Sequence, residues 1–369
     1  MTEQSTYTVR KYKDGDEIEI NRLFNEILCK DRHRTLDEWR WKMKENPAKV
    51  KDIANYITVV EADGKVIGQY ASWPVDFKYK DEIVKVGHPM ENFIHPDYRL
   101  SFDVQLDMFN RQYEATSEED VSFGFGFPNQ VAYLIGKRFL GYKDIGELAT
   151  LSTRLSFLFP VKRRFPFLPK VLFSLIQQMS EYFYKIKINL TKRQSDISVE
   201  EVVEFNSEYD ELWNKVKDYY PLLAVRDGVY MNWRYLKKPT REYKIFFARK
   251  GAEIKGCIVL KIIDDSTYFW GARVGLIMEL LCLKGVDIPG ELLKTALNYF
   301  VSGGVDFSVA VLLKDDILLN GFLNAGFAIR DNIYKHRMVY KIYNEREIDE
   351  SVLKDTRNWH VMFGDFDPL

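Results

Sequence analysis

The spacing of hydrophobic residues divides residues 16–139 into helices and strands. Apolar residues three and four positions apart predict helices, and alternating apolar and polar positions predict strands. The pair Asp63-Gly64 between two apolar runs predicts a tight hairpin turn. The expected helices are 16–30, 36–45, 102–113 and 129–139, and the expected strands are 56–60, 66–73, 76–79, 83–94 and 121–127.

A second set of elements follows from about Val199 onward and has the same order. The expected helices are 209–218, 229–236, 289–301 and 316–325, and the expected strands are 243–249, 255–263, 268–270, 275–283 and 307–313. In both sets a helix lies between two strands near the end, which predicts a sheet with some parallel pairing.

The two sets also share residues at a constant offset, which predicts one domain that was duplicated and fused. Gly68 and Gly256 are 188 residues apart, and Met90-Glu91 and Met278-Glu279 are separated by the same distance. The expected domains are 1–150 and 199–345, with a linker over 151–198 and a polar tail over 346–369. The tail is expected to start as early as Arg337.

A tryptophan-arginine pattern occurs in both sets as well. Trp39-Arg40-Trp41 and Trp233-Arg234-Tyr235 are compatible with an acceptor pocket or with core packing. We favour core packing because repeated large aromatic residues bury extensive area.

Bulk composition removes several classes of function. The net charge of −1 offers no overall attraction for nucleic acid. Three widely spaced cysteines and five histidines show no metal-ligand spacing, so no metal site is expected. The polar N-terminus lacks a signal-peptide pattern and no apolar run is long enough to cross a bilayer, so a cytoplasmic location is expected.

The expected linker is basic and aromatic. Nine lysines and arginines lie between Arg154 and Arg193, against the single acidic residue Glu181. Such a segment fits weak contact with an anionic membrane surface, or an aromatic face that bridges the two domains. We favour an aromatic face that bridges the two domains. The oligomeric state stays open.

Two segments of the first set resemble the GNAT acyltransferase superfamily, whose members transfer an acyl group from coenzyme A to an amine. They are Ile94-His95-Pro96-Asp97-Tyr98-Arg99 and Phe127-Pro128-Asn129, the latter followed by Ala132 and Leu140-Gly141-Tyr142. The resemblance implies an α+β fold of two tandem GNAT-like domains, each a mixed, mostly antiparallel sheet flanked by helices. It also implies an acyl-CoA donor, acetyl-CoA first among them, and an amine acceptor on a small molecule, sugar or peptide.

The resemblance assigns the coenzyme to the end of the fourth strand and the following helix N-terminus. By that likeness the binding residues are Phe93, Ile94, Arg99, Leu100, Ser101, Phe102, Asp103, Val104 and Asn129. The sequence departs from the family pattern there, since Phe102 and Val104 stand where the family has glycines and Asp103 adds a negative charge.

The catalytic residues follow from the same resemblance. Glu91 on the fourth strand would accept the proton of the amine. Lys137 stands where the family often has the tyrosine that protonates the leaving thiolate, so Tyr133 or Tyr142 would replace it.

Two other functions fit the same fold. A GNAT pair that has lost catalysis would serve as a binding or assembly module, as the missing glycines suggest. A Fem-like aminoacyl-transferase would use aminoacyl-tRNA, although the balanced charge gives that donor no support.

Overall fold

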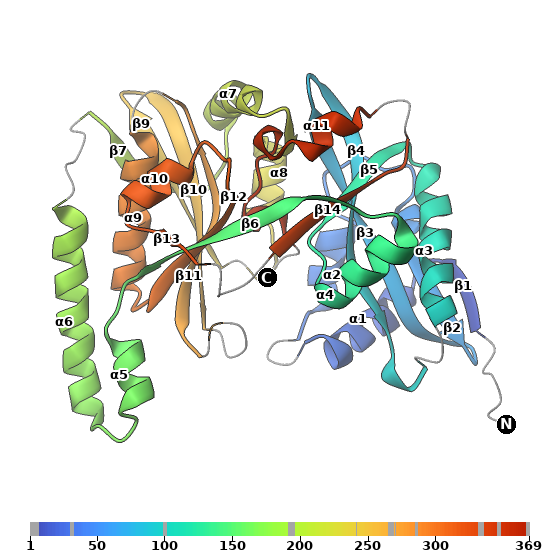
Figure 1. The fold of residues 1–369 in the computed structure, drawn as a ribbon, viewed down its shortest axis with the longest axis horizontal. Helices are drawn as coiled ribbons and strands as arrows, with labels where there is room; N and C mark the ends of the chain where they lie inside the picture. Colours follow the sequence, from blue (N-terminus) through green and yellow to red (C-terminus); the bar gives the residue numbers. More distant parts are fainter. Residues whose placement is uncertain are drawn as a thin grey trace.

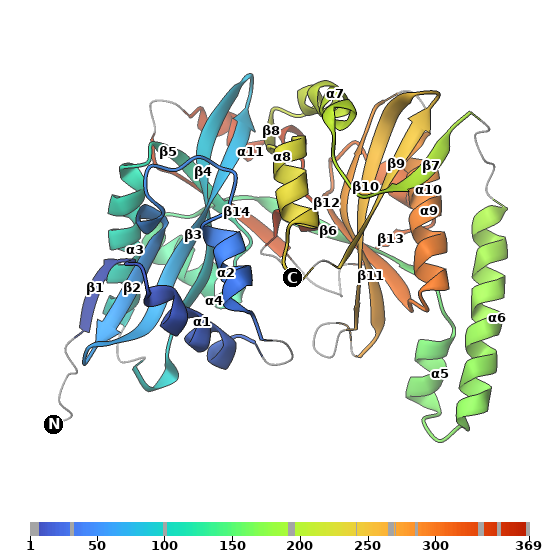
Figure 2. The ribbon, with the colours of Figure 1, turned by 180° about the vertical axis from the view of Figure 1, so that it is seen from behind.

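A mostly antiparallel sheet of 14 strands runs through the whole protein, and helices cover its faces (Figures 1 and 2). The computed structural model describes residues 7–29, 33–98, 102–190, 196–240, 242–264, 269, 271–284, 287–330, 336–344 and 348–366. The strand order is β1-β2-β3-β4-β5-β14-β6-β12-β11-β10-β9-β7, with β13 paired to β6 and β8 to β3. This arrangement confirms the predicted α+β class.

Between residues 16 and 139 the first half follows the predicted order of elements, and one unexpected strand precedes this region and another follows it. Its elements are β1 (Tyr7–Lys11), α1 (Asp16–Ile27), α2 (Leu36–Met43), β2 (Ile57–Ala62), β3 (Lys65–Tyr79), β4 (Glu82–Ile94), α3 (Phe102–Ser117), β5 (Val121–Gly126), α4 (Gln130–Ile135) and β6 (Lys143–Arg154). Asp63 and Gly64 both have positive φ, as a two-residue hairpin turn requires. The two strands expected over 66–73 and 76–79 are one strand, because β3 pairs with β4 without a break from Ala71 to Tyr79.

The second half repeats the central part of this order. Its elements are β7 (Ser198–Val202), α7 (Ser207–Val216), β8 (Leu222–Ala224), α8 (Gly228–Met231), β9 (Tyr243–Lys250), β10 (Glu253–Asp264), β11 (Arg273–Cys282), α9 (Ile288–Ser302), β12 (Phe307–Leu313), α10 (Leu319–Asn324), β13 (Ala328–Ile329), β14 (His336–Ile342) and α11 (Glu350–Lys354). The strand expected over 268–270 lies almost entirely outside the described residues. In each half one strand pair is parallel, β4 with β5 and β11 with β12.

The two halves exchange strands. Strand β6 leaves the first half and pairs with β12 over Leu148–Arg154, while β14 returns from the second half to lie between β5 and β6. Figure 1 shows β6 crossing the molecule from one half to the other. The last strand of each half is therefore supplied by the other, which the sequence did not predict.

The C-terminal residues are packed, which corrects the expected polar tail. Trp359, Val361, Met362 and Phe363 are all buried, and Trp359 packs edge to face against Phe77 of β3. Of the expected tail over 346–369, residues 346–347 and 367–369 lie outside the described part.

The aromatic residues of the tryptophan-arginine pattern belong to the core, as favoured from the sequence, whereas Arg40 is exposed. Trp41 and Trp233 stack with ring centroids 4.9 Å apart, and each indole N–H donates to the backbone oxygen of the other residue. Both side chains are buried, so the pair joins the halves, and neither lines the opening between β4 and β5.

The expected linker contains a helical hairpin of α5 (Leu158–Arg164) and α6 (Lys170–Asn189). It stands at the edge of the second half, beside α9, and does not bridge the two halves (Figures 1 and 2). Among the described helices, none has the length and apolar character needed to pass through a bilayer.

Candidate functional site

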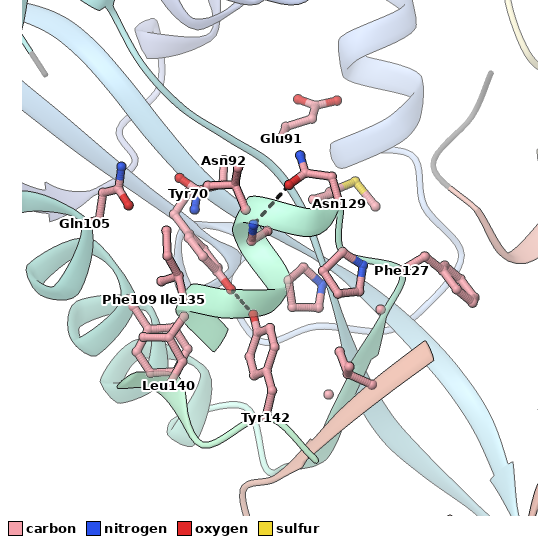
Figure 3. A pocket seen from close by; sticks show the side chains of 18 of the residues that line it. Tyr70, Glu91, Asn92, Gln105, Phe109, Phe127, Asn129, Ile135, Leu140 and Tyr142 are labelled. Atoms are coloured by element: carbon pink, nitrogen blue, oxygen red, sulfur yellow. Dashed lines mark hydrogen bonds between the residues drawn. The ribbon is translucent and has the colours of Figure 1, made fainter. Parts of the chain in front are cut away.

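A cavity of about 640 Å³ opens where β4 and β5 diverge. The two parallel strands pair only between Lys85–Gly87 and Val121–Gly124, although β4 continues to Ile94 and β5 to Gly126. Figure 3 shows the side chains around this opening. Most are apolar or aromatic, and they come from α1, β3, β4, α3, β5, α4 and β14.

Alternation along β5 creates room on the cavity side. The side chains of Phe123 and Phe125 pack into a core cluster, although Phe125 also borders the cavity, and Gly124 and Gly126 line the cavity without a side chain. A Cβ on Gly124 would lie 2.8 Å from the hydroxyl oxygen of Tyr343, so that glycine permits close packing. A Cβ on Gly126 would meet nothing closer than 3.9 Å, so that position faces open space.

Glu91 lies at the cavity in a backbone bulge, with φ of 50°. Its buried carboxylate accepts hydrogen bonds from Arg34 Nη1 and Lys42 Nζ, both at 2.6 Å, and from Gln69 Nε2 at 3.1 Å. Burial alone would raise the pKa of Glu91, but the charges of Arg34 and Lys42 outweigh it and lower the pKa to about 2. The group is a firmly ionised carboxylate and a weak proton acceptor.

The two tyrosines expected as proton donors lie in different places. Tyr142 lines the cavity with its hydroxyl oxygen 3.5 Å from that of Tyr70, and burial raises the pKa of both (Figure 3). Tyr133 does not line the cavity; a hydrogen bond to Asp144 raises its pKa, and Arg337 lies over its ring at 4.4 Å. Of the two expected tyrosines, Tyr142 is therefore the one that lies where a ligand in this cavity could be reached.

Three of the residues expected to bind coenzyme lie at the cavity, namely Phe93, Ile94 and Asn129. Asn129 also caps α4, because its side-chain oxygen accepts from the Ala132 backbone N–H at 2.9 Å. Both interpretations of this asparagine, cap and cavity residue, are thus compatible with its position.

The coenzyme-binding residues expected around the N-terminus of α3 do not gather at the cavity in the described part of the chain. Val104 is buried in the core beneath α3, whereas Asp103 is exposed in the first turn of this helix. The pKa of Tyr7 is raised mainly by its hydrogen bond to Asp107 and by burial, and the charge of Asp103 adds a smaller increase. Neither Val104 nor Asp103 lines the cavity. Arg99, Leu100, Ser101 and the side chain of Phe102 lie outside the described part of the chain.

Sequence reasoning missed the contribution of β14. Lys341 and Tyr343 line the cavity, and Lys341 Nζ donates to the Leu140 backbone oxygen at 2.9 Å and lies 4.5 Å from the ring centroid of Phe109. Burial lowers the pKa of Lys341. Lys341 is brought to the first half by the pairing of β14 with β5. No sequence motif indicates this long-range pairing, so the position of the lysine could not be predicted.

Comparison with known proteins adds the identity of the fold. The amino-acid sequence matches no protein-family model and no curated protein. A solved GCN5-related N-acetyltransferase from Anabaena variabilis is 12% identical, with 92% of this chain and 73% of that chain covered and a TM-score of 0.60. One from Kribbella flavida is also 12% identical, with 92% and 72% covered and a TM-score of 0.58.

The fold is that of the GCN5-related N-acetyltransferases. Saccharomyces cerevisiae N-myristoyltransferase, solved with bound myristoyl-CoA, is similar too, at 10% identity, 93% and 85% coverage and a TM-score of 0.56. The resemblance inferred from the sequence is confirmed at the level of this fold, and the division into two tandem domains stays a prediction.

The second half of this GCN5-related fold has a corresponding opening, and it is filled. Strands β11 and β12 pair only over Val274–Leu276 and Phe307–Val309, and the C-terminal segment 359–366 packs beside β11. Met362 and Phe363 enter the cores on opposite faces of the sheet, and the backbone N–H of Leu280 donates to Met362 Sδ at 3.1 Å.

Glu279, the counterpart of Glu91 by sequence offset, is part of this filling. Its carboxylate accepts from Arg226 Nε at 3.0 Å and from the Tyr235 hydroxyl at 2.9 Å. Arg226 also donates to Asp365 in the C-terminal segment at 2.6 Å. Glu279 therefore holds the segment in place and does not line the β4–β5 cavity, which agrees with a structural role.

Among the described residues, no group of three or more histidine, cysteine or acidic side chains is arranged to hold a metal ion.

Proposed function

We propose that this protein binds an acyl-CoA in the cavity between β4 and β5 and transfers the acyl group to an amine. The proposal is carried by one observation, the 640 Å³ opening between two diverging parallel strands in a GCN5-related fold. A cavity of this size falls in the range that accommodates small-molecule ligands and cofactors. The filled opening beside β11 leaves the first half as the place for the coenzyme.

The composition of the cavity fits an acyl thioester with a pantetheine arm. Phe93, Ile94, Leu106, Phe109 and Ile135 supply apolar surface for the acyl group. Polar groups are few and lie at separate points, among them Asn92, Gln105 and Asn129, which would hold the amides of the arm. When bound, the coenzyme supplies the activated acyl group. The helix dipole at the N-terminus of α3 would attract the phosphates, against the opposing charge of the exposed Asp103 in the first turn.

Each cavity residue has a definite task in this proposal. Tyr142 lines the cavity and carries a hydroxyl proton at neutral pH, so its position would let it give a proton to the leaving sulfur, although burial raises its pKa and makes it a weaker acid. Net transfer forms one C–N bond, breaks one C–S bond and moves one proton from nitrogen to sulfur. Glu91, with its low pKa, would act as a positioning residue that fixes Arg34, Lys42 and the β4 bulge.

The acyl chain and the acceptor are the finer parts of the proposal. Acetyl-CoA is the simplest donor, and the predominantly apolar walls also suit longer chains. The similar N-myristoyltransferase was solved with myristoyl-CoA, so a chain-length series is the informative comparison. The acceptor is proposed to be an amine of a small molecule, a sugar or a peptide.

The decisive experiment fills the cavity from β5. Gly126→Leu would place a large side chain in the cavity, whereas Gly126→Ala adds a methyl group that has room and serves as the matched control. Calorimetry with acetyl-, octanoyl- and myristoyl-CoA should show binding to wild type and Gly126→Ala, and at least tenfold weaker binding to Gly126→Leu.

The outcomes separate the candidate functions. Binding together with acyl transfer to a panel of amines supports the enzyme. Binding without transfer to any acceptor favours the non-catalytic binding module, for which the missing glycines at Phe102 and Val104 are the specific observation. If no acyl-CoA binds wild type, the proposed function is refuted.

A further inference from the structure

The α5–α6 hairpin exposes an unusual concentration of apolar side chains. Of the 23 large hydrophobic side chains that are exposed in the described part of the chain, eleven lie between Phe157 and Leu190. Scattered exposed apolar residues are normal, but a contiguous patch marks a contact surface. The hairpin is therefore the strongest candidate for an interaction surface.

The exposed residues form a stripe on one side of α6. Three to four positions separate Val171, Leu175, Met179, Tyr182 and Ile186, so they lie on one face of the helix. Tyr182, for example, is 71% exposed. The stripe follows a helix of 20 residues, about 30 Å in length.

The opposite face of α6 is already used. Tyr184 and Ile188 are buried in the core beside α9, and the hydroxyl of Ser180 accepts from the Phe157 backbone N–H at 3.0 Å. The hairpin is anchored by this inner face, and its outer face is free to meet another surface (Figure 1).

The charge of the hairpin indicates what that surface is. Lys162, Arg163 and Arg164 are exposed at the end of α5, and Lys170 is exposed at the start of α6. The one acidic residue between them and Leu190 is Glu181, which is paired with Lys185 at 2.6 Å. The exposed face thus combines positive charge with apolar area and carries no unpaired negative charge.

Aromatic residues occupy the turn between the two helices. Phe165 and Phe167 are exposed there, Phe167 at 78%, between the basic ends of α5 and α6. An amphipathic helix with basic residues beside large apolar ones has the composition of helices that lie in the interface of a bilayer. Basic side chains bind anionic headgroups while apolar ones enter the boundary with the acyl chains.

We propose that the α5–α6 hairpin docks this protein on an anionic membrane surface. The stripe on α6 lies along the interface, Phe165 and Phe167 insert at the turn, and the neighbouring basic residues contact lipid phosphates. The hairpin stands at the far end of the molecule from the β4–β5 cavity (Figure 1), so this proposal does not depend on the proposed function.

Vesicle flotation with the full-length protein tests the proposal. Vesicles of phosphatidylglycerol and phosphatidylcholine in equal parts should bind wild type, vesicles of phosphatidylcholine alone should bind it far more weakly, and salt should reduce the binding. The triple variant Lys162→Gln, Arg163→Gln, Arg164→Gln should bind roughly 100-fold more weakly, because each basic residue near the surface contributes about fivefold. Phe165→Ser with Phe167→Ser should lose at least about tenfold.

Matched controls come from other parts of the surface. Ile83→Ser with Val203→Ser removes two exposed apolar residues, and Lys13→Gln, Lys49→Gln and Lys65→Gln remove three exposed charges. Both control variants should bind as wild type does.

Three results would overturn the proposal. One is equal binding to neutral and anionic vesicles, and another is undiminished binding by both hairpin variants. The third is self-association that Phe165→Ser with Phe167→Ser abolishes, which analytical ultracentrifugation would detect and which would assign the face to a second copy.

Discussion

The ion-pair cluster around Glu91 makes a quantitative prediction about stability in acid. Its pKa is lowered from an ordinary value of 4.5 to about 2 by Arg34 and Lys42, against the opposing effect of burial. One pKa unit corresponds to about 1.4 kcal/mol, so the shift represents about 3 kcal/mol of folding stability. Because the folded-state pKa is the lower one, this stability is complete above the unfolded value and is lost as pH falls from about 4.5 to about 2.

Replacing the glutamate separates its titration from that of the other carboxylates. Glu91→Gln should cost about 3–5 kcal/mol at neutral pH, since it leaves Arg34 and Lys42 buried beside an uncharged amide. The variant should also lose less further stability than wild type between pH 4.5 and about pH 2, by about 3 kcal/mol. Urea unfolding at a series of pH values measures both quantities.

A surface carboxylate provides the control. Glu114 is exposed and pairs with Arg111 at 3.3 Å, so Glu114→Gln should change neutral stability by less than about 1 kcal/mol and keep the acid slope of wild type. If wild type and Glu91→Gln lose stability in parallel from pH 4.5 downward, then the buried cations do not hold Glu91 ionised. The assignment of Glu91 as a charged positioning residue would then fail.

Three further substitutions test the packing that shapes the two openings. Gly364→Ala should destabilise by about 1–3 kcal/mol in urea, because its Cβ would overlap Glu279; unchanged stability would contradict the filled second opening. Gly124→Ala should cost a similar amount, and adding Tyr343→Phe should restore part of it, because the clashing atom is the hydroxyl oxygen. Trp41→Ala should cost about 3–5 kcal/mol by removing the stacked contact between the halves, and a loss under 1 kcal/mol would show that this contact is not made.

Local patterns in the sequence were sufficient for β4, α3 and β5, which line the cavity, and for β12 in the second half. The expected strands 83–94 and 307–313 correspond to β4 (Glu82–Ile94) and β12 (Phe307–Leu313), because apolar runs bounded by turn residues fix strand limits. The expected helix 102–113 is α3, which continues to Ser117. Strand β5 was also expected, and its glycines provide close packing at Gly124 as anticipated.

Long-range pairing was the part that the sequence did not reveal. Strands β6 and β14 have no local feature that distinguishes pairing within a half from pairing across the halves. Lys341 was missed for this reason, since only the exchanged strand brings it to the cavity. The low pKa of Glu91 could not be predicted from the sequence either. It depends on Arg34 and Lys42, which are 57 and 49 positions away in the sequence.

The asymmetry of the two openings arises from residues that follow both repeated sets. The shared offset includes Glu91 and Glu279, yet the first glutamate lies at a cavity and the second is covered by Gly364 and Asp365. The region 336–366 produces both results, since β14 completes the first cavity with Lys341 while the segment after α11 fills the second opening. Differences within the two sets of elements are therefore not required for one half to have a cavity and the other to have its opening filled. A comparison of the two sets of elements alone would not explain this difference, because Lys341 and Met362 lie after both sets.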